Sequence, residues 1–244
     1  MIKLELPPKP TQLTDEFQAI KTQEFVESGK TKNVWNVNWL KDAVFQMAFG
    51  KCCYSEIRLG EESKYMEVEH YHHKVKYYDE VMLWGNLFPA CKKCNATKGK
   101  HDTVFEPIVN PFEDQPKEHL IFKSYRYFPL NSKGKTTIDV LALNDRDHFV
   151  NPRFKIGNKL AEELEDLYEN IDALNNPRKN ARYLYRLKSL LKQGGKKEEY
   201  AALVSTVILQ DVNYQKIEIE LKLKSLWDEE FELFKQELLF CALI

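Results

Sequence analysis

At 244 residues, the chain is long enough for one large domain or two modest ones, and 43% hydrophobic with 30% charged residues is typical of soluble globular proteins. The formal net charge of -1 neither indicates nor excludes a nucleic-acid partner. No apolar run reaches the roughly 20 residues that cross a bilayer, and the first residues lack the features of a secretion signal. We therefore expect a cytoplasmic protein without a membrane contact.

The first fifty residues begin with a proline-rich arm, "LPPKPTQL", which is followed by two predicted helices. These helices span roughly Asp15–Ser28 and Asn36–Phe49, and Gly50 follows as a helix-ending residue. The next segment reads as strand, loop, strand and short helix: "MEV", then "LWGNLFPAC", then "KKCNATKGK", in which Gly99 ends the helix. Further along, "LIFKSYRYFPL" and "TTIDVLAL" flank "NSKGK" and predict a hairpin.

From residue 151 onward the apolar spacing becomes helical. Two predicted helices present the faces Leu160, Leu164, Leu167, Ile171 and Ala181, Leu184, Leu187, Leu191. Gly194 and Gly195 end the second helix. Residues 216–224 are ambiguous, because their apolar residues alternate as in a strand, whereas Ser225 and Asp228 resemble a capping box that opens a helix. The chain therefore predicts an α+β fold in three parts, 1–50, 51–150 and 151–244, of which the last is mostly helical.

The last residues, "ELLFCALI", are too apolar to remain in water and too short to cross a membrane. Two arrangements would cover them. They can fold back on their own domain, or they can insert into a groove of a partner and make the helical part a docking domain.

The segment that carries chemistry runs from Glu67 to Lys100. It contains the adjacent pair Glu69 and His70, and side chains of adjacent strand residues point to opposite faces. One of the pair can therefore bind a metal ion while the other meets a substrate. Asn86 and Asn95 follow, the second on the short predicted helix, together with lysines that cluster around this element.

These residues resemble the HNH endonucleases and their ββα-metal fold. The resemblance rests on "CCYSE", "EVEHYHHK" and "WGNLFPACKKCNATKG", with Glu69 and His70 in the place of the acidic-histidine pair and Asn86 in the place of the middle asparagine. Asn95 stands where the last histidine is usual, and an amide oxygen also suits a hard divalent cation.

The resemblance implies a metal-dependent phosphodiester hydrolase. In it, His70 is the general base, Asn86 orients His70, and Glu69 and Asn95 bind one Mg²⁺ or Mn²⁺ ion. Lys98 lies one helical turn from Asn95, so we expect it to contact a backbone phosphate. DNA is the favoured substrate, and RNA remains open. For His72, His73 and Lys74, contact with phosphate and simple cover of the loop both remain open.

The cysteines predict a separate site. Cys91 and Cys94 keep the Cys-x-x-Cys spacing that relatives carry twice, but the first half reads Cys52-Cys53-Tyr54-Ser55, which puts a serine in the second ligand position. Structural zinc normally has four cysteine or histidine ligands. Either Cys52, Cys91 and Cys94 bind zinc with a fourth group, for which Cys53, His72 and His73 are candidates, or packing has replaced the metal.

Motifs outside the catalytic segment, "KPTQLTDEF", "PIVNPFEDQPKEHLIF" and "TTIDVLALND", resemble the HNH subunits of Septu-type and retron-linked bacterial anti-phage systems. That resemblance implies an ABC-type ATPase partner. The chain itself contains no G-x-x-x-x-G-K-[ST] phosphate loop. Two alternatives to a nuclease effector are a non-catalytic zinc-containing module that binds nucleic acid and a structural adaptor.

Overall fold

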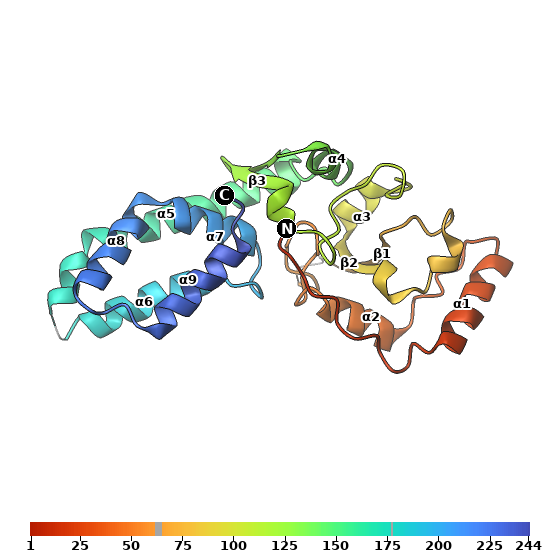
Figure 1. Cartoon of the computed structure of the whole chain (residues 1–244), viewed down its shortest axis with the longest axis horizontal. Coiled ribbons are helices and arrows are strands. Elements are labelled where there is room, and N and C mark those ends of the chain that lie inside the picture. Colours follow the sequence, from red (N-terminus) through yellow and green to blue (C-terminus); the bar gives the residue numbers. More distant parts are fainter. Residues whose placement is uncertain (62–64, 177) are drawn as a thin grey trace. The chain divides into compact units, whose positions relative to one another are not determined.

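Figure 1 shows the protein as a computed structural model, which describes residues 1–61, 65–176 and 178–244. Within these residues, helices predominate, and the strands form two antiparallel pairs. The expected α+β class is confirmed.

The described chain forms two compact units, and each is discontinuous in sequence. The first, here called the mixed unit, consists of Lys3–His119 and Pro129–Leu143. The second, here called the helical unit, consists of Met1–Ile2, Leu120–Phe128 and Asn144–Ile244. The division into three parts at residues 50 and 150 stays a prediction about independent domains.

The mixed unit begins with the two expected helices, α1 (Asp15–Glu27) and α2 (Asn38–Gln46). Thr14 caps α1, since its hydroxyl oxygen accepts a hydrogen bond from the backbone N–H of Phe17 at 3.1 Å. After α2, Gly50 takes a φ of +72° and donates its N–H to the carbonyl oxygen of Phe45 at 3.0 Å. Both predicted helices are present, but α2 ends at Gln46 with Met47 as its C-cap, so the predicted end at Gly50 is about one turn too late.

The centre of the mixed unit is a ββα element, seen in Figure 1 as β1, β2 and α3. Strands β1 (Met66–His70) and β2 (Leu87–Cys91) pair antiparallel, with Glu69 opposite Phe88. The short 3-10 helices η1 (Tyr78–Glu80) and η2 (Trp84–Asn86) lie between the strands in sequence.

Helix α3 (Lys92–Lys98) follows β2 directly and contacts both strands. It ends where Gly99 takes a φ of +51°. The predicted order of strand, loop, strand and short helix is therefore confirmed. The end of β2 lies opposite Met66, the first residue of β1, and α3 then packs on both strands.

The predicted hairpin around "NSKGK" is wrong. The 3-10 helix η3 (Pro116–Glu118) precedes a hairpin that lies entirely within "LIFKSYRYFP", formed by β3 (Leu120–Lys123) and β4 (Arg126–Pro129). Its two turn residues, Ser124 and Tyr125, both have positive φ, as a tight hairpin turn requires.

The residues after β4 form a helix, α4 (Ser132–Val140), in place of the second predicted strand. Asn131 caps it by accepting the N–H of Gly134 at 3.0 Å. Thr137 and Ile138 are buried, because helical spacing places them on the inner face. The β-branched residues in this segment had suggested a strand, and the cap together with tertiary packing outweighs that tendency.

In the helical unit, a π-helical turn, η4 (Arg146–Val150), leads into α5, and Figure 1 shows the helices that follow. The remaining elements are α5 (Asn151–Glu169), η5 (Ile171–Asn175), α6 (Asn180–Lys192), α7 (Ala201–Gln210), α8 (Val212–Leu223) and α9 (Glu229–Cys241). Helix α7 is buried along most of its length and packs on α5, α8 and α9. Among the described residues, none of the helices has the length and apolar character that a bilayer crossing requires.

The predicted apolar faces are largely confirmed. Leu160, Leu164 and Leu167 are buried in α5, whereas Ile171 lies beyond its end and is only half-buried. On α6, Leu187 and Leu191 are buried.

Ala181, at the start of α6, is exposed, and Leu184 is half-buried. Tyr183 and Leu190 complete the buried face of α6 in their place. The ambiguous residues 216–224 are helical as part of α8, apart from the last one. The cap of α9 is Asp228, whose carboxylate accepts the N–H of Phe231 at 3.0 Å.

The apolar end of the chain folds back on its own unit. Leu238, Cys241, Ala242 and Leu243 are buried. The backbone N–H of Leu243 donates to the hydroxyl of Thr206 at 2.9 Å, and its carbonyl oxygen accepts from the N–H of Phe122 at 2.9 Å. Of the two arrangements expected for this tail, the structure shows the intramolecular one.

Candidate active site

A pocket of about 220 Å³ opens beside the end of β1 and the inner face of α3. Its lining includes Glu69, His70, His73, Lys74, Asn95 and Lys98. Three of the four expected site residues, Glu69, His70 and Asn95, thus meet at one pocket, because β1 and α3 pack against each other. Asn86 is not part of the lining.

His70 is held as a neutral imidazole. Its Nε2 lies 3.0 Å from the carbonyl oxygen of Val81, and a carbonyl oxygen only accepts, so Nε2 carries the proton. Nδ1 is then left with its lone pair. Burial lowers the pKa of His70 to about 3, and the nearby positive charge of Lys74 acts in the same direction. The edge of Trp35 supports the ring, with 4.4 Å between the ring centroids.

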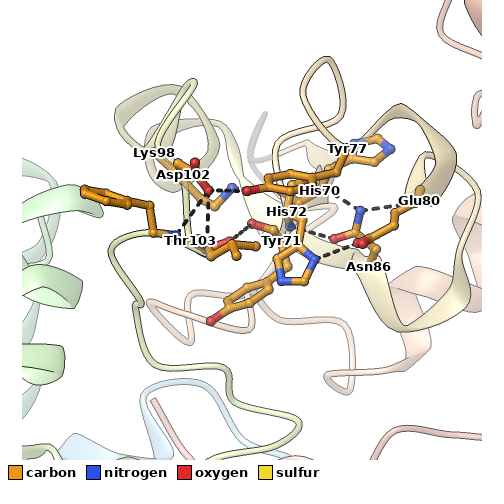
Figure 2. A network of polar contacts seen from close by, with 11 residues as sticks. His70, Tyr71, His72, Tyr77, Glu80, Asn86, Lys98, Asp102 and Thr103 are labelled. Atoms are coloured by element: carbon orange, nitrogen blue, oxygen red, sulfur yellow. Dashed lines mark hydrogen bonds and ion pairs between the residues drawn. The ribbon is translucent and has the colours of Figure 1, made fainter.

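Asn86 acts on the loop between the strands. Figure 2 shows its side chain between the backbone of His72 and that of Glu80. Its Oδ1 accepts the N–H of His72 at 2.6 Å, and its Nδ2 donates to the carbonyl oxygen of Glu80 at 3.1 Å. In the described part of the chain it makes no hydrogen bond to His70. Asn86 fixes the loop that contains Glu80 and Val81, and the carbonyl oxygen of Val81 holds the imidazole, so any orienting effect of Asn86 on His70 acts through this loop.

Glu69 is buried, with only 1% of its surface exposed, and it pairs with Lys98. The Nζ atom of Lys98 lies 2.6 Å from Oε1 of Glu69 and donates to the backbone carbonyl oxygen of His70 at 2.7 Å. Burial raises the pKa of Glu69, while the charge of Lys98 opposes that rise. No hydrogen-bond donor in residues 1–61, 65–176 and 178–244 satisfies either carboxylate oxygen beyond this ion pair.

These contacts show that Lys98 is buried, which differs from the surface position expected for a lysine that binds phosphate. We expected a lysine that reaches a phosphate from the surface, but its side chain is buried and its ammonium group faces Glu69 inside the pocket. Contact between Lys98 and a phosphate stays a prediction, and it would require the phosphate to enter the pocket.

Only the nitrogen end of the Asn95 side-chain amide has a hydrogen-bond partner in the described part of the chain. Its Nδ2 donates to Oε2 of Glu67, so Oδ1 is the end that remains available. A buried carboxylate whose Oε2 has no partner among the described residues and an available amide oxygen suit a hard divalent cation such as Mg²⁺ or Mn²⁺. The side chains present therefore fit the metal that the sequence led us to expect.

The neighbouring histidines differ from each other. His73 lines the pocket, whereas His72 pairs through Nδ1 with Glu80 at 2.6 Å. Figure 2 also shows Asp102, which accepts the hydroxyl hydrogen of Tyr77 at 2.7 Å, and Thr103, whose hydroxyl donates to the carbonyl oxygen of Tyr71 at 2.8 Å. These bonds tie the segment after α3 to the loop after β1 and so brace the residues next to His70.

A second cluster lies at the start of the ββα element. The Sγ atoms of Cys52, Cys91 and Cys94 all lie within 4.8 Å of one another, and all three residues are buried. The hydroxyl of Ser55 lies 3.7 Å from Sγ of Cys91, and its backbone N–H donates to Sγ of Cys52 at 3.5 Å. The cluster can hold a metal ion such as zinc.

Ser55 therefore lies beside two of the three sulfurs, those of Cys52 and Cys91. The candidates Cys53, His72 and His73 do not join the cluster within the described residues. Burial alone would raise the pKa of the Cys52 thiol, but hydrogen bonds from Cys91, Cys94 and Ser55 hold that pKa well below its usual range. The three sulfurs would bind a metal ion as thiolates.

No protein-family model matches the chain. It is 40% identical over 238 residues to Septu protein PtuB of Bacillus thuringiensis, an alignment that covers 95% of this chain and 91% of that protein. The chain belongs to the Septu PtuB family. Septu protein PtuB of Bacillus mycoides (strain KBAB4) is 28% identical over 190 residues, which are 60% of this chain and 64% of the relative. The first likeness extends over almost the whole chain, so it includes residues of both units.

Two further residues lie next to His70 in this PtuB-family chain, and the sequence had left a phosphate contact open for only one of them, Lys74. Trp35 supports His70, and Lys74 lines the pocket with its ammonium group 4.3 Å from the centroid of the Trp35 ring. Sequence reasoning gave Trp35 no role at the site, because only the packing of the segment before α2 brings its ring against His70. The roles of Glu69, His70, Asn86 and Asn95 in catalysis stay predictions.

Proposed function

We propose that this chain is a metal-dependent HNH endonuclease that hydrolyses phosphodiester bonds of nucleic acid, with DNA as the favoured substrate. One observation carries the proposal: a neutral histidine with an available Nδ1 lies in the same pocket as a buried carboxylate and an amide oxygen. Metal-assisted hydrolysis requires this combination of a general base and hard oxygen ligands.

In this proposal His70 is the general base. Nδ1 accepts a proton from the attacking water, and the Val81 carbonyl oxygen on the other side of the ring stabilises the imidazolium that results. Trp35 prevents the ring from turning away. Asn86 is a positioning residue, because it holds the loop that carries Val81 and does not reach the reacting atoms.

Glu69 and Asn95 would hold Mg²⁺ or Mn²⁺, which when bound neutralises charge on the scissile phosphate and on the departing oxygen. Lys98 lies beside Glu69 and offsets the charge of its carboxylate. Lys74 lines the pocket and attracts a phosphate toward it. These lysines bring the substrate's negative charge to the place where His70 can act.

We further propose that the chain is the nuclease effector of an anti-phage system and works with an ABC-type ATPase subunit. Its membership of the Septu PtuB family and the motifs outside the catalytic segment support this role. The helical unit offers exposed apolar side chains on α8 and α9, among them Leu223 and Leu233. Such side chains are suited to bury against a partner.

Cleavage of plasmid DNA tests the nuclease proposal. We expect nicking or linearisation with Mg²⁺ or Mn²⁺ by the wild type, and its loss in the His70→Ala variant. His148→Ala, a change at an exposed histidine of the helical unit, serves as the matched control and should cleave as the wild type does. Equal cleavage by His70→Ala would overturn the assignment of the base, and RNA substrates run in parallel identify the preferred nucleic acid.

The second candidate function is a non-catalytic zinc-containing module that binds nucleic acid. The buried cluster of three cysteines favours it, because such a cluster can stabilise a small binding unit without any reaction. This alternative requires the cysteines and not His70. A His70→Ala protein that fully retains phage protection in cells would support it against the nuclease.

A further inference from the structure

A second pocket adjoins the active-site pocket and is not used by the mechanism above. It measures about 360 Å³, within the range of about 300 to 1,000 Å³ typical of ligand pockets. The two pockets share Val68, Lys74 and Asn95 as walls. A molecule that fills both would therefore pass directly from one to the other.

Trp35 lines the second pocket and contacts His70 of the first. Its ring edge rests on His70, while the ammonium group of Lys74 covers its face at 4.3 Å from the ring centroid. The side chain is only 7% exposed, so its face is not available for stacking. Recognition in the second pocket must therefore depend on hydrogen bonds at the edge of a ligand.

The outer wall offers such hydrogen bonds. It is formed by the segment before and within α2, where Asn33, Asn36 and Lys41 line the pocket. Their side chains make no hydrogen bond or ion pair with the part of the protein that the structure describes. Two amides and one ammonium group are thus available to a ligand.

Glu67 also lines the pocket, with its carboxylate bound to the amide of Asn95. A carboxylate repels a phosphate but accepts hydrogen bonds from amino and hydroxyl groups. The pocket therefore combines the cationic side chains of Lys41 and Lys74 with hydrogen-bond donors and acceptors. These groups are complementary to a nucleotide, which has a negatively charged phosphate and a base with donors and acceptors of its own.

We propose that this second pocket binds the nucleotide next to the scissile phosphate, with its base unpaired. The inference rests on the proposed nuclease function and names the form of its substrate. The strand is covalently continuous, so a phosphate beside His70 places its neighbouring nucleotide in the adjoining pocket. The amides of Asn33 and Asn36 hydrogen-bond the Watson–Crick edge of the base, which is accessible only when the base has left its pair.

Binding without cleavage tests the proposal. Fluorescence anisotropy in EDTA would compare a fluorescein-labelled single strand with its duplex, using the wild type and the double variant Asn33→Ala/Asn36→Ala. We expect the double variant to bind the single strand roughly tenfold more weakly. Asn38→Ala, an exposed asparagine of the same segment that does not line the pocket, is the matched control and should bind as the wild type does.

Two further measurements sharpen the result. Lys41→Ala should lower the slope of log affinity against log salt by about one, as expected for the loss of one phosphate contact. Single abasic substitutions along the strand should weaken binding to the wild type most at one position. That penalty should disappear in the double variant if its amides recognise the missing base.

The outcomes separate this inference from the nuclease itself. If the double variant binds and cuts single strands as the wild type does, the second pocket is not a nucleotide site, although the nuclease assignment stands. If the wild type never cleaves but the double variant loses binding, the pocket assignment stands without the nuclease. A wild type that binds duplex as tightly as single strand, or that binds no single strand, overturns the proposal.

Discussion

The imidazole Nε2 of His70 lies 3.0 Å from the backbone carbonyl oxygen of Val81, eleven residues further along the chain. The geometry of the proposed base therefore depends on a loop and not on a neighbouring side chain. Asn86, the last residue before β2, holds that loop by three side-chain hydrogen bonds to the backbone of His72 and Glu80.

Replacing Asn86 with alanine should therefore impair catalysis without touching the metal ligands. We expect a large fall in kcat, an unchanged metal affinity, and a loss of about 1–3 kcal/mol of unfolding free energy from the buried backbone groups left without partners. Denaturant melts, metal titration and cleavage rates would measure the three quantities. A variant with wild-type kcat would show that the loop keeps its shape without Asn86.

Lys98 and a bound metal ion both supply positive charge beside Glu69. Lys98→Met leaves that carboxylate buried without its partner, which should cost about 3–5 kcal/mol of stability in EDTA. Added Mg²⁺ or Mn²⁺ should recover part of the loss. Unfolding in denaturant with and without metal would measure this.

Lys100→Met, two residues further on and exposed, is the control for that experiment and should change stability by less than about 0.5 kcal/mol. If Lys98→Met matched the wild type in EDTA, the ion pair with Glu69 would contribute nothing to the fold.

Because Ser55 lies beside the cysteine cluster, a substitution at this residue tests whether the cluster binds metal. Ser55→Cys supplies a fourth sulfur ligand, so it should bind zinc more tightly than the wild type in competition with a chelator. If the natural site holds zinc, elemental analysis of wild-type protein purified without chelator should find about one ion per chain.

Cys53→Ala, His72→Ala and His73→Ala should leave the zinc content unchanged, because these residues do not join the cluster among the described residues. Loss of zinc in any of the three would identify a fourth ligand that differs from Ser55. A folded wild type without metal would mean that packing alone maintains the cluster.

The end of the chain predicts a stability effect. Leu243→Ala removes a buried side chain from the helical unit and should lower the free energy of unfolding by about 2–5 kcal/mol. Ile244→Ala, at an exposed position, should change it by less than about 0.5 kcal/mol. Thermal or denaturant melts of both variants measure the difference, and equal stabilities would contradict the intramolecular role of the tail.

Local signals in the sequence predicted much of the ββα element. Alternation in "MEV" marked β1, and Gly99 marked the end of α3, because both depend on neighbouring residues alone. The prediction of the hairpin failed for a related reason. Its turn residues, Ser124 and Tyr125, have positive φ, a conformation for which glycine or asparagine is the usual signal in a sequence. Because "NSKGK" contains such residues, the turn was predicted there instead.

The site was predictable only in part. Glu69, His70 and Asn95 lie in one short segment, and their convergence follows from the pairing of that segment with itself. Trp35 comes from a different part of the chain, and its position against His70 depends on how the segment before α2 packs. The burial of Lys98 likewise depends on tertiary contacts, and no pattern of neighbouring residues distinguishes a buried lysine from an exposed one.

The discontinuity of the two units limits how this protein can be divided in the laboratory. The helical unit includes Leu120–Phe128, which holds most of the β3–β4 hairpin. The residues that follow, Pro129–Leu143, belong to the mixed unit. A single cut after residue 119, 128 or 143 therefore leaves at least one unit without a segment that belongs to it. Expressing either unit alone requires joining separated stretches with new linkers, for example bridging residues 119 and 129 to complete the mixed unit.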